Sequence, residues 1–474
     1  MMISAGGEGY GKLLLAHEQC STAEKPSRDG YAKALALVEP ELRRGALETA
    51  KQQGLWTIRE YAQGGVGHGA AAGISPGEES IRSRCPRSFY SVLLYEAPHV
   101  EGPLQPDFGT GAKSPVERGL QAAGESCPAM VKLGFLGCGY VGQGVHLPNF
   151  LATGKCEVVA LAEARPKLAS KVAERHGIPR VYPSQMELAL DPEVQAVAAI
   201  TSVAFNRETT VPLLRAGKHV FIEKPVAPTS AEGHEMIAAA REGRAMLMVA
   251  YMKRYDPGIQ WAKERIAQFR STGEMGELLL ARAHCFGGEW TAGYRPDIIR
   301  SDELAPPAKP RTPEWLPDEL RMPYLTFNNV FCHDLNVLRF LLEPSDTTVA
   351  EARYSGKAFA VLLEMDGLPV TLETGFASGT WEEEADVYFE KCRMRIKMPP
   401  PLLRQGAAHV TLWKEGTLAE VFAPAPSERS WAFFREAEYF LDCVSEGKQP
   451  LSPGEDSVID VELAEAVFRR LMKS

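Results

Sequence analysis

The feature that most restricts the fold is an alternation of short apolar runs and helical stretches from Val131 to Ala250. The predicted strands are 131–136, 158–161, 196–201, 218–222 and 245–250, and the predicted helices between them are 140–152, 166–176, 208–216 and 230–244. Strands that alternate with helices of this length form parallel βαβ units. The sequence therefore predicts a doubly wound α/β domain over residues 130–250.

The alternation stops after about Tyr251. A long strand is predicted over 278–286, short alternating segments fill 345–425, and two helices, 431–445 and 456–472, close the chain. This pattern predicts an α+β domain with a large, mostly antiparallel sheet over residues 251–474. Within it, basic residues occupy every second position of 391–397, which favours a strand with one solvated face over a polyanion site.

The first 129 residues differ from the rest of the chain. They are rich in glycine, and residues 62–77 have neither charge nor periodicity, as is typical of a flexible linker. One short helix is predicted over 41–53. We expect residues 1–129 to be a largely disordered extension, compatible with a leader, a misassigned start or the remnant of another domain.

Composition excludes several classes of protein. The 52 Lys and Arg residues against 61 Asp and Glu residues give a net charge of −9, which argues against a nucleic-acid-binding protein. No apolar stretch reaches the roughly 18 residues of a membrane helix, and the N-terminus lacks the pattern of a signal peptide. Nine cysteines without a CxxC pair suit free thiols, so a cytoplasmic location is expected.

A glycine motif supplies the strongest chemical signal. Gly137, Gly139 and Gly142 follow the first predicted strand and open the first helix, which is the context of a dinucleotide-binding turn. Gly137 permits the tight turn, Gly139 lets the backbone approach a pyrophosphate, and Gly142 permits close packing of helix on strand. An ordinary βα turn is the alternative, which the combination of strand, helix and spacing disfavours.

An acidic residue occurs at the end of the second predicted strand. Glu163 lies 21 residues after Gly142, where a carboxylate accepts both ribose hydroxyls of an adenosine and repels a 2′-phosphate. NAD is therefore favoured over NADP as the cofactor. Arg165 lies two residues further on and weakens this preference.

A second constellation follows a later strand. The predicted strand 218–222 ends in Glu223, Lys224 and Pro225. Ligands of parallel sheets bind at the carboxyl ends of the strands, so Lys224 is expected beside the cofactor, where it could share or donate a proton. Without further context, a solvated lysine would be the commoner interpretation.

Further context comes from an apolar helix predicted over 330–342. Asn329, His333 and Asn336 share one polar stripe on this helix, and a substrate could supply the partners that buried polar groups need. A satisfied core histidine is the alternative. Cys332, His333 and Asp334 are adjacent and point apart, so they cannot form a metal site or triad, and no catalytic metal is predicted.

Together these segments resemble one family. The glycine motif, the stretch 217–225 with Lys224, the stretch 251–257 (YMKRYDP), the His333 helix and the ending 433–472 are similar to the glucose–fructose oxidoreductase / inositol dehydrogenase (Gfo/Idh/MocA) family. The resemblance covers Met130 to Ser474. It implies a Rossmann NAD(P)-binding domain, and an enzyme that oxidises or reduces one hydroxyl of a sugar, cyclitol or sugar derivative.

The resemblance also implies roles for individual residues. Lys224 would bind and polarise the reacting oxygen, and His333 would act as general base or acid. Asn329 and Asn336 occupy positions where many members have aspartate, and Asn206 corresponds to a frequent histidine, so carboxylate charge is lost from the pocket. Arg254 and Tyr255 would lie near the entrance to the substrate or cofactor.

The resulting hypothesis is an NAD(P)-dependent oxidoreductase with the following site. The catalytic residues are Lys224 and His333; the cofactor-binding residues are Gly137, Gly139, Tyr140, Val141, Gly142, Glu163, Thr201, Asn206, Glu223 and Lys224; the substrate-binding residues are Lys224, Arg254, Tyr255, Asn329 and His333. A loop with Trp290 and Tyr294 is expected to cover the pocket, and the C-terminal sheet is expected to form a homo-oligomer. The alternative is a non-catalytic dinucleotide-binding sensor on the same fold.

Overall fold

The computed structural model describes residues 130–309, 311–376 and 379–473. The predicted extension 1–129, with its helix at 41–53 and its linker at 62–77, lies outside the described residues.

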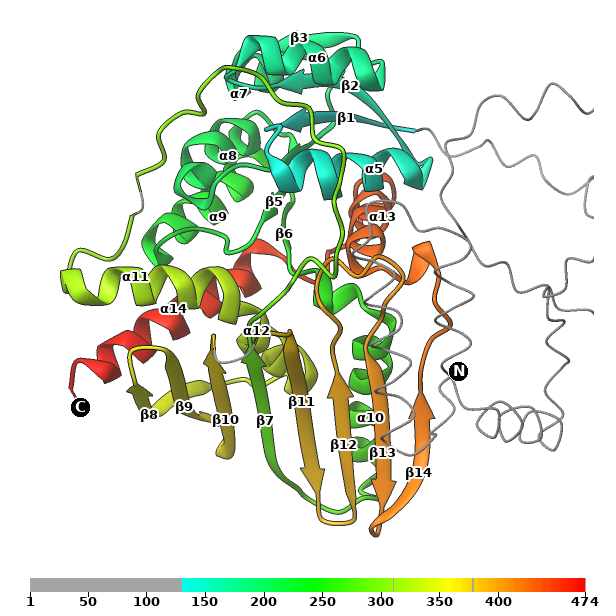
Figure 1. The fold of residues 1–474 in the computed structure, drawn as a ribbon, viewed down its shortest axis with the longest axis vertical. Coiled ribbons are helices and arrows are strands. Elements are labelled where there is room, and N and C mark those ends of the chain that lie inside the picture. Colours follow the sequence, from blue (N-terminus) through cyan, green and yellow to red (C-terminus); the bar gives the residue numbers. More distant parts are fainter. Residues whose placement is uncertain (1–129, 310, 377–378, 474) are drawn as a thin grey trace, which may run out of the picture. The chain divides into compact units, whose positions relative to one another are not determined.

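Residues 131–250 form a six-stranded parallel sheet in the order β3-β2-β1-β4-β5-β6 (Figure 1). The strands are β1 (Val131–Leu136), β2 (Cys156–Ala162), β3 (Arg180–Tyr182), β4 (Ala196–Ala199), β5 (His219–Glu223) and β6 (Leu247–Ala250). The helices are α5 (Leu147–Thr153), α6 (Pro166–His176), α7 (Gln185–Leu190), α8 (Asn206–Arg215) and α9 (Ser230–Gly243). The predicted α/β domain is confirmed. The crevice of such a sheet lies at the carboxyl ends of the neighbouring strands β1 and β4, where the strand order reverses.

Two apolar layers enclose this sheet. Side chains of α7, α8 and α9 pack on one face, and side chains of α5 and α6 pack on the other. The central strands are buried on both faces, which explains why β4 consists only of alanine and valine. β3 and α7 were not predicted, because a three-residue edge strand and a six-residue helix are too short for a periodic signal.

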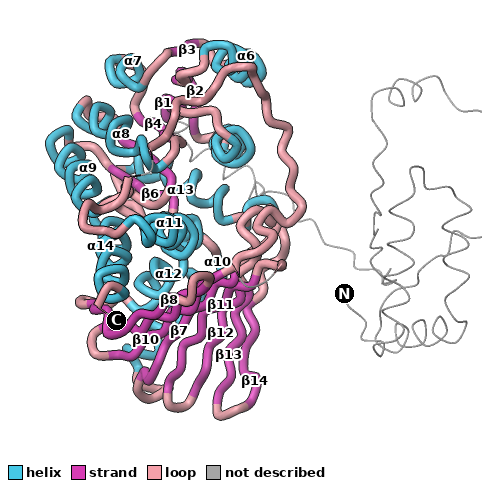
Figure 2. The backbone as a smooth tube through the Cα atoms, turned by 60° about the vertical axis from the view of Figure 1, so that its left-hand side comes forward, coloured by secondary structure: helices cyan, strands magenta, loops and turns pink. Residues whose placement is uncertain are grey.

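The second sheet has eight strands in the order β14-β13-β12-β11-β7-β10-β9-β8 (Figures 1 and 2). They are β7 (Leu278–Phe286), β8 (Thr347–Tyr354), β9 (Ala358–Met365), β10 (Leu368–Gly375), β11 (Glu382–Phe389), β12 (Cys392–Lys397), β13 (His409–Lys414) and β14 (Thr417–Phe422). Neighbours are antiparallel except β7 and β10, which run parallel. The predicted mostly antiparallel sheet is thus confirmed.

Helices cover one face of this sheet. α10 (Pro257–Thr272), α12 (Cys332–Leu342) and α14 (Gly454–Leu471) contribute to the apolar core against the strands. α12 is buried along its whole length and follows one π-helical turn, η4 (Phe327–Phe331), and the short helix α11 (Asp318–Thr326). This arrangement places the predicted His333 helix between the sheet and the Rossmann domain.

The basic strand predicted at 391–397 is β12, and its side chains are paired. Arg393 and Arg395 donate hydrogen bonds at 3.0 Å to Oδ1 of Asp386, which is fully buried on neighbouring β11. Arg282 of β7 forms a third ion pair with the same carboxylate at 3.3 Å. The face is therefore partly neutralised by an acid from the next strand, which the local sequence pattern could not show.

The C-terminal helices complete both domains. α13 (Ala432–Glu446) packs on the Rossmann sheet, where Phe440 lies against Phe150 and Phe221. Ser452, just before α14, accepts a backbone hydrogen bond from Val249 of edge strand β6 at 2.9 Å, and its hydroxyl donates to the Val249 carbonyl oxygen at 2.6 Å. Residues far beyond 251 thus take part in the Rossmann core. Among the described residues, no helix has the length and apolar character needed to cross a membrane.

Candidate active site

The glycine motif forms the turn between β1 and the π-helical turn η1 (Gly142–His146) that leads into α5. Gly137 has φ of +94°, and a Cβ there would lie 2.3 Å from the carbonyl oxygen of Ile200. A Cβ on Gly142 would lie 2.7 Å from the carbonyl oxygen of Gly137. In contrast, nothing lies within 4 Å of a Cβ built on Gly139. The turn is tight where it packs on the protein and open at Gly139, which fits an approaching pyrophosphate.

Glu163 follows β2 and is 5% exposed. Its carboxylate accepts a hydrogen bond from the Cys138 amide at 2.7 Å, and from the Arg165 guanidinium at 2.8 and 3.0 Å. Burial raises the pKa of Glu163, but these hydrogen bonds outweigh it and hold the pKa below its usual range. The carboxylate is therefore anionic at the carboxyl end of β2, and Arg165 is already paired with it.

The long loop after β7 is tied to the glycine-turn helix. The Tyr294 hydroxyl donates to the carbonyl oxygen of Gly144 at 2.8 Å. The Gln143 amide and the Ile299 backbone exchange two hydrogen bonds, at 2.9 and 3.1 Å. Trp290 of this loop lines the cavity described below. The predicted cover is therefore a loop fixed at several points against the Rossmann domain.

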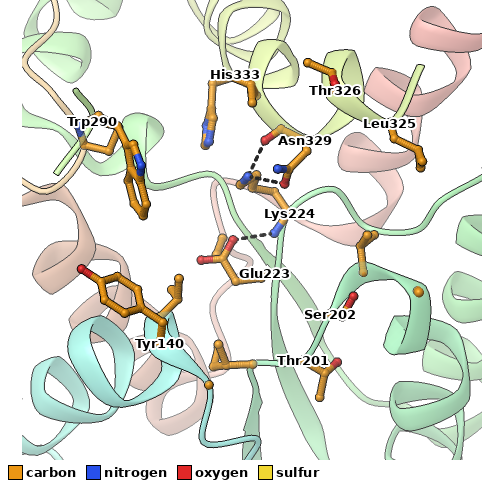
Figure 3. Close-up of a pocket in the computed structure, with 18 of the residues that line it drawn as sticks. Tyr140, Thr201, Ser202, Glu223, Lys224, Trp290, Leu325, Thr326, Asn329 and His333 are labelled. Carbon is orange, nitrogen blue, oxygen red and sulfur yellow. Dashed lines mark hydrogen bonds between the residues drawn. The ribbon is translucent and has the colours of Figure 1, made fainter. Parts of the chain in front are cut away.

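Lys224 lies just after β5, at the carboxyl end of the sheet. Its backbone N–H donates to the Glu223 carboxylate at 3.1 Å. Its ammonium donates to the backbone oxygen of Asn329 at 2.5 Å and to the side-chain oxygen of Asn329 at 3.2 Å (Figure 3). Lys224 is thus joined to η4, the π-helical turn that leads into the helix carrying His333.

Asn206 supports this loop from within the protein. It is 1% exposed, and its amide donates to three backbone carbonyl oxygens within 223–226 at 3.1–3.3 Å. Its side-chain oxygen accepts a hydrogen bond from Thr201 at 3.3 Å. Thr201 lines the cavity and Asn206 does not. Asn206, predicted to bind the cofactor, instead positions the backbone that carries Lys224.

Glu223 is oriented by a residue that the sequence did not reveal. The buried imidazole Nε2 of His146 lies 2.7 Å from Oε1 of Glu223. Burial raises the pKa of Glu223, but the hydrogen bond from His146 and the charge of Lys224 outweigh it, so the pKa lies below its usual range. His146 is in the helix after the glycine turn, and one histidine in a helix carries no sequence signal.

His333 enters the same region from α12. It is 8% exposed, and its ring lies edge-on to Tyr251 with ring centroids 5.9 Å apart. Burial, followed by the charges of Lys224 and Lys253, lowers the pKa of His333 well below its usual value. Figure 3 shows the imidazole pointing toward the space above Lys224. A neutral imidazole in this position can accept a proton.

One cavity of about 850 Å³ connects these groups. The predicted site residues that line it are Gly139, Tyr140, Val141, Gly142, Thr201, Glu223, Lys224, Asn329 and His333. Lys224 and His333, which are far apart in the chain, therefore face one space together with the glycine turn. This is the spatial arrangement on which the sequence-based hypothesis depends.

Some predicted residues do not line this cavity: Gly137, Glu163, Asn206, Arg254 and Tyr255 of the predicted site, and Asn336 of the predicted polar stripe. Arg254 donates to the side-chain oxygen of Asn336 at 2.7 Å and pairs with Asp456 at 2.5 Å. The Tyr255 hydroxyl lies 2.9 Å from the Ser452 hydroxyl. Arg254, Tyr255 and Asn336 are at most 4% exposed and do not line the cavity. They hold η3 (Met252–Tyr255), α12 and the C-terminal segment together, so the contact with substrate predicted for Arg254 and Tyr255 is not retained.

A buried ionisable cluster lies behind His333. Cys285, Asp334 and Glu383 bring ligand-type atoms within 4.8 Å of one another, and the Lys253 ammonium contacts Glu383. Burial raises the pKa of Asp334 to about 6. Because Lys253 supplies a positive charge here, the cluster contains its own cation. Its members come from four different elements, so no local motif indicates it.

Comparison with known proteins agrees with this geometry. Residues 131–251 match the model of the "Oxidoreductase family, NAD-binding Rossmann fold" (GFO_IDH_MocA). This segment is a Gfo/Idh/MocA-family Rossmann domain. The predicted resemblance is thereby confirmed, together with the expectation of an oxidoreductase that uses a nicotinamide dinucleotide.

Individual relatives extend the similarity beyond this Gfo/Idh/MocA domain. An inositol 2-dehydrogenase of Pseudomonas fluorescens is 28% identical over 343 residues, which cover 67% of this chain and 87% of the relative. A trans-1,2-dihydrobenzene-1,2-diol dehydrogenase of Oryctolagus cuniculus is 36% identical over 164 residues, covering 35% of this chain and 47% of the relative. The structure of an aldose-aldose oxidoreductase of Caulobacter crescentus has a TM-score of 0.58 at 20% identity and covers 73% of this chain and 98% of that one, which shows a shared fold.

Proposed function

We propose that this chain is an NAD(P)-dependent dehydrogenase that acts on a CH–OH group of a sugar, cyclitol or sugar derivative. The observation that carries the proposal is the cavity that Lys224, His333 and the glycine turn share. Similarity to inositol 2-dehydrogenase over most of that relative's length supports a polyol substrate.

Residues of the chain can be assigned to the dinucleotide. Gly137, Gly139 and Gly142 would receive the pyrophosphate, Glu163 would receive the ribose hydroxyls, and Thr201, Glu223 and Lys224 would flank the nicotinamide. A bound nicotinamide dinucleotide supplies the acceptor or donor of the hydride.

A preference for NAD over NADP has structural support at the adenosine end. Glu163 is anionic there and Arg165 is paired with it. A second carboxylate, Glu303, accepts hydrogen bonds from the first two helical amides after Pro166 at 3.0–3.1 Å. These amides at the start of α6 would otherwise favour an anion, so a 2′-phosphate would meet two carboxylates instead.

The reacting alcohol would lie between Lys224 and His333. The imidazole of His333, kept neutral by burial, would take the hydroxyl proton. The Lys224 ammonium would stabilise the negative charge that develops on the oxygen. Asn329 holds that ammonium through two oxygens without adding a charge.

The test is reduction of NAD across a panel of sugars and cyclitols, followed by absorbance of the reduced cofactor. Lys224→Ala should lower turnover by about 10²–10³-fold while the Kd for NAD changes little. Lys357→Ala, in an exposed turn, is the matched control. Full turnover by Lys224→Ala would refute the role of this lysine, and a dinucleotide-binding protein that oxidises nothing in the panel would favour a sensor.

The proposal also covers the location and the oligomeric state of the protein. We expect a small-molecule substrate, a cytoplasmic location and a homo-oligomer formed through the eight-stranded sheet, whose outer side carries the Arg393 and Arg395 pairs described above. Analytical ultracentrifugation of the full chain would test the oligomer.

A further inference from the structure

Six large apolar side chains line the cavity, and we call them the apolar rim. They are Trp290 after β7, Met322 and Leu325 of α11, Val330 of η4, Phe376 after β10 and Trp381 before β11. In Figure 3, Trp290 and Leu325 flank the Lys224–Asn329 pair from opposite sides. The rim therefore adjoins the groups proposed to hold the reacting alcohol.

Several members of the apolar rim are open to solvent. Trp290 is 40% exposed, Phe376 is 54% exposed and Met322 is 67% exposed. A single exposed apolar side chain is ordinary, but a group of them around one cavity is typical of a site for an apolar ligand.

The aromatic rings of the rim are held in place by their neighbours. The Trp290 ring lies edge-on to Tyr140 with centroids 6.3 Å apart, and the Phe376 ring lies 5.6 Å from that of Phe331. Ordered rings lose little conformational entropy when a ligand covers them, so they are effective binding surfaces.

Polar groups near the rim are mostly engaged within the protein. The indole N–H of Trp381 donates to the Glu383 carboxylate at 2.9 Å. The Arg311 guanidinium donates to the backbone oxygen of Ala204 at 2.6 Å and pairs with Glu208 at 2.9 Å. The rim thus presents mainly carbon atoms to a ligand.

The polar side chains beside the rim gather in one place, between Trp290 and Leu325 in Figure 3. Lys224, Asn329 and His333 lie together, with Thr326 nearby in Figure 3. These groups can satisfy the reacting hydroxyl and its immediate neighbours. A hydroxyl placed against the rim would lose its hydrogen bonds to water without gaining partners, which is unfavourable.

We propose that the substrate is a polyol ring that carries a flat apolar substituent, as an aryl glycoside does, with the substituent against the apolar rim. This inference rests on the proposed dehydrogenase function and narrows its substrate class. The polyol ring occupies the polar region around Lys224 and His333, and the substituent covers the exposed faces of Trp290 and Phe376.

Matched pairs of ligands test this proposal without knowledge of the natural substrate. Phenyl and methyl β-glucosides, and phenyl and methyl β-galactosides, differ within each pair only in the substituent. Binding to the full chain saturated with NAD would be measured by titration calorimetry, and oxidation by absorbance. The phenyl member of at least one pair should bind about ten- to a hundredfold more tightly than its methyl partner, as expected for an added apolar contact in a fitted pocket.

Variants of the apolar rim test whether the preference for the phenyl glycoside arises there. Phe376→Ser and Trp290→Ser should each reduce the ratio of phenyl to methyl affinity by about tenfold while the affinity for the methyl glycoside stays the same. Leu190→Ser is the matched control, because Leu190 in α7 is 79% exposed and does not line the cavity.

The outcomes separate the two proposals. Equal binding of phenyl and methyl members, or no binding by either, overturns the apolar-substituent proposal even if free polyols are oxidised. A phenyl preference that the rim variants leave intact also overturns it. So does a rim variant that changes the oligomeric mass but leaves the ratio of phenyl to methyl affinity unchanged. A phenyl preference that depends on the rim, without any oxidation, supports the apolar site and counts against the dehydrogenase.

Discussion

The ammonium of Lys224 and the side-chain oxygen of Asn329 lie 3.2 Å apart, and the Asn329 backbone oxygen is closer still, at 2.5 Å. The Lys224 loop and the π-helical turn before α12 are therefore joined at the point where the alcohol is proposed to react. Asn329 supplies oxygen ligands to the ammonium without supplying negative charge. We therefore expect the charge of the side chain at position 329 to affect the protonation of the groups around the reacting alcohol.

Replacement of Asn329 by aspartate should move the pH profile of turnover. The pKa of His333 lies well below its usual value because of burial and two nearby lysines, so the imidazole is neutral across the neutral range. A carboxylate at 329 favours the protonated imidazole and raises this pKa. The acidic limb of kcat/KM should therefore shift to higher pH in Asn329→Asp. Asn329→Ser, which adds no charge, is the control, and an equal shift in both variants would contradict this account.

Substitutions at two glycines of the turn should have different effects, one on the stability of the fold and the other on cofactor binding. Gly137→Ala forces a side chain into a backbone with φ of +94° and against the Ile200 carbonyl, so it should lower the free energy of unfolding by about 2 kcal/mol or more. Gly139→Ala places its Cβ in open space, so it should leave stability within about 0.5 kcal/mol.

The same Gly139→Ala variant should bind NAD about tenfold more weakly, because its methyl group occupies space proposed for the pyrophosphate. Urea unfolding and equilibrium titration with NAD measure the two effects independently. Unchanged NAD affinity in a stable Gly139→Ala protein would place the pyrophosphate elsewhere.

The part of this site that the sequence predicts correctly is the part that depends on local patterns of strands and helices. The glycine turn and Lys224 each follow a strand, so strand periodicity alone places them at the same edge of the sheet. The stripe of Asn329, His333 and Asn336 was only partly correct. Asn329 belongs to a π-helical turn and His333 to the α-helix after it, so the three do not keep one helical phase.

Contacts between residues far apart in the sequence could not be predicted from local patterns. Asn336 is drawn into hydrogen bonds with Arg254 and with Asp460, which is 124 residues away. Lys253 meets Glu383 only because η3 and β11 approach each other in three dimensions. The apolar rim likewise combines residues of α11 with residues that flank β10 and β11, and no single segment contains enough of it to give a signal.

Cofactor preference should respond to Glu163. In Glu163→Ser the carboxylate is lost and the Arg165 guanidinium is released from its hydrogen bonds at 2.8 and 3.0 Å. The ratio of kcat/KM for NAD to that for NADP should fall by about ten- to a hundredfold, as expected for loss of a charged hydrogen bond and of charge repulsion. The double variant Glu163→Ser with Arg165→Ser should fall less far. An unchanged ratio in both variants would show that the adenosine ribose lies away from β2.

Stability should depend on pH through Asp334. This carboxyl is fully buried and its pKa is raised from 3.8 to about 6, chiefly by burial. The folded state thus binds the proton more tightly than the unfolded state. The contribution of Asp334 to stability is present below pH 3.8 and is lost as the pH rises through about 6.

Asp334→Asn should therefore become more stable relative to the parent protein as the pH rises from about 4 to about 6, by about 2–3 kcal/mol in total. Urea unfolding at a series of pH values measures this difference, with the exposed Asp318→Asn as control. A difference that is independent of pH would mean that Asp334 stays ionised beside Lys253. In that case Asp334→Asn would leave the charge of Lys253 uncompensated beside His333, lower the pKa of the imidazole further and shift the acidic limb of kcat/KM to lower pH.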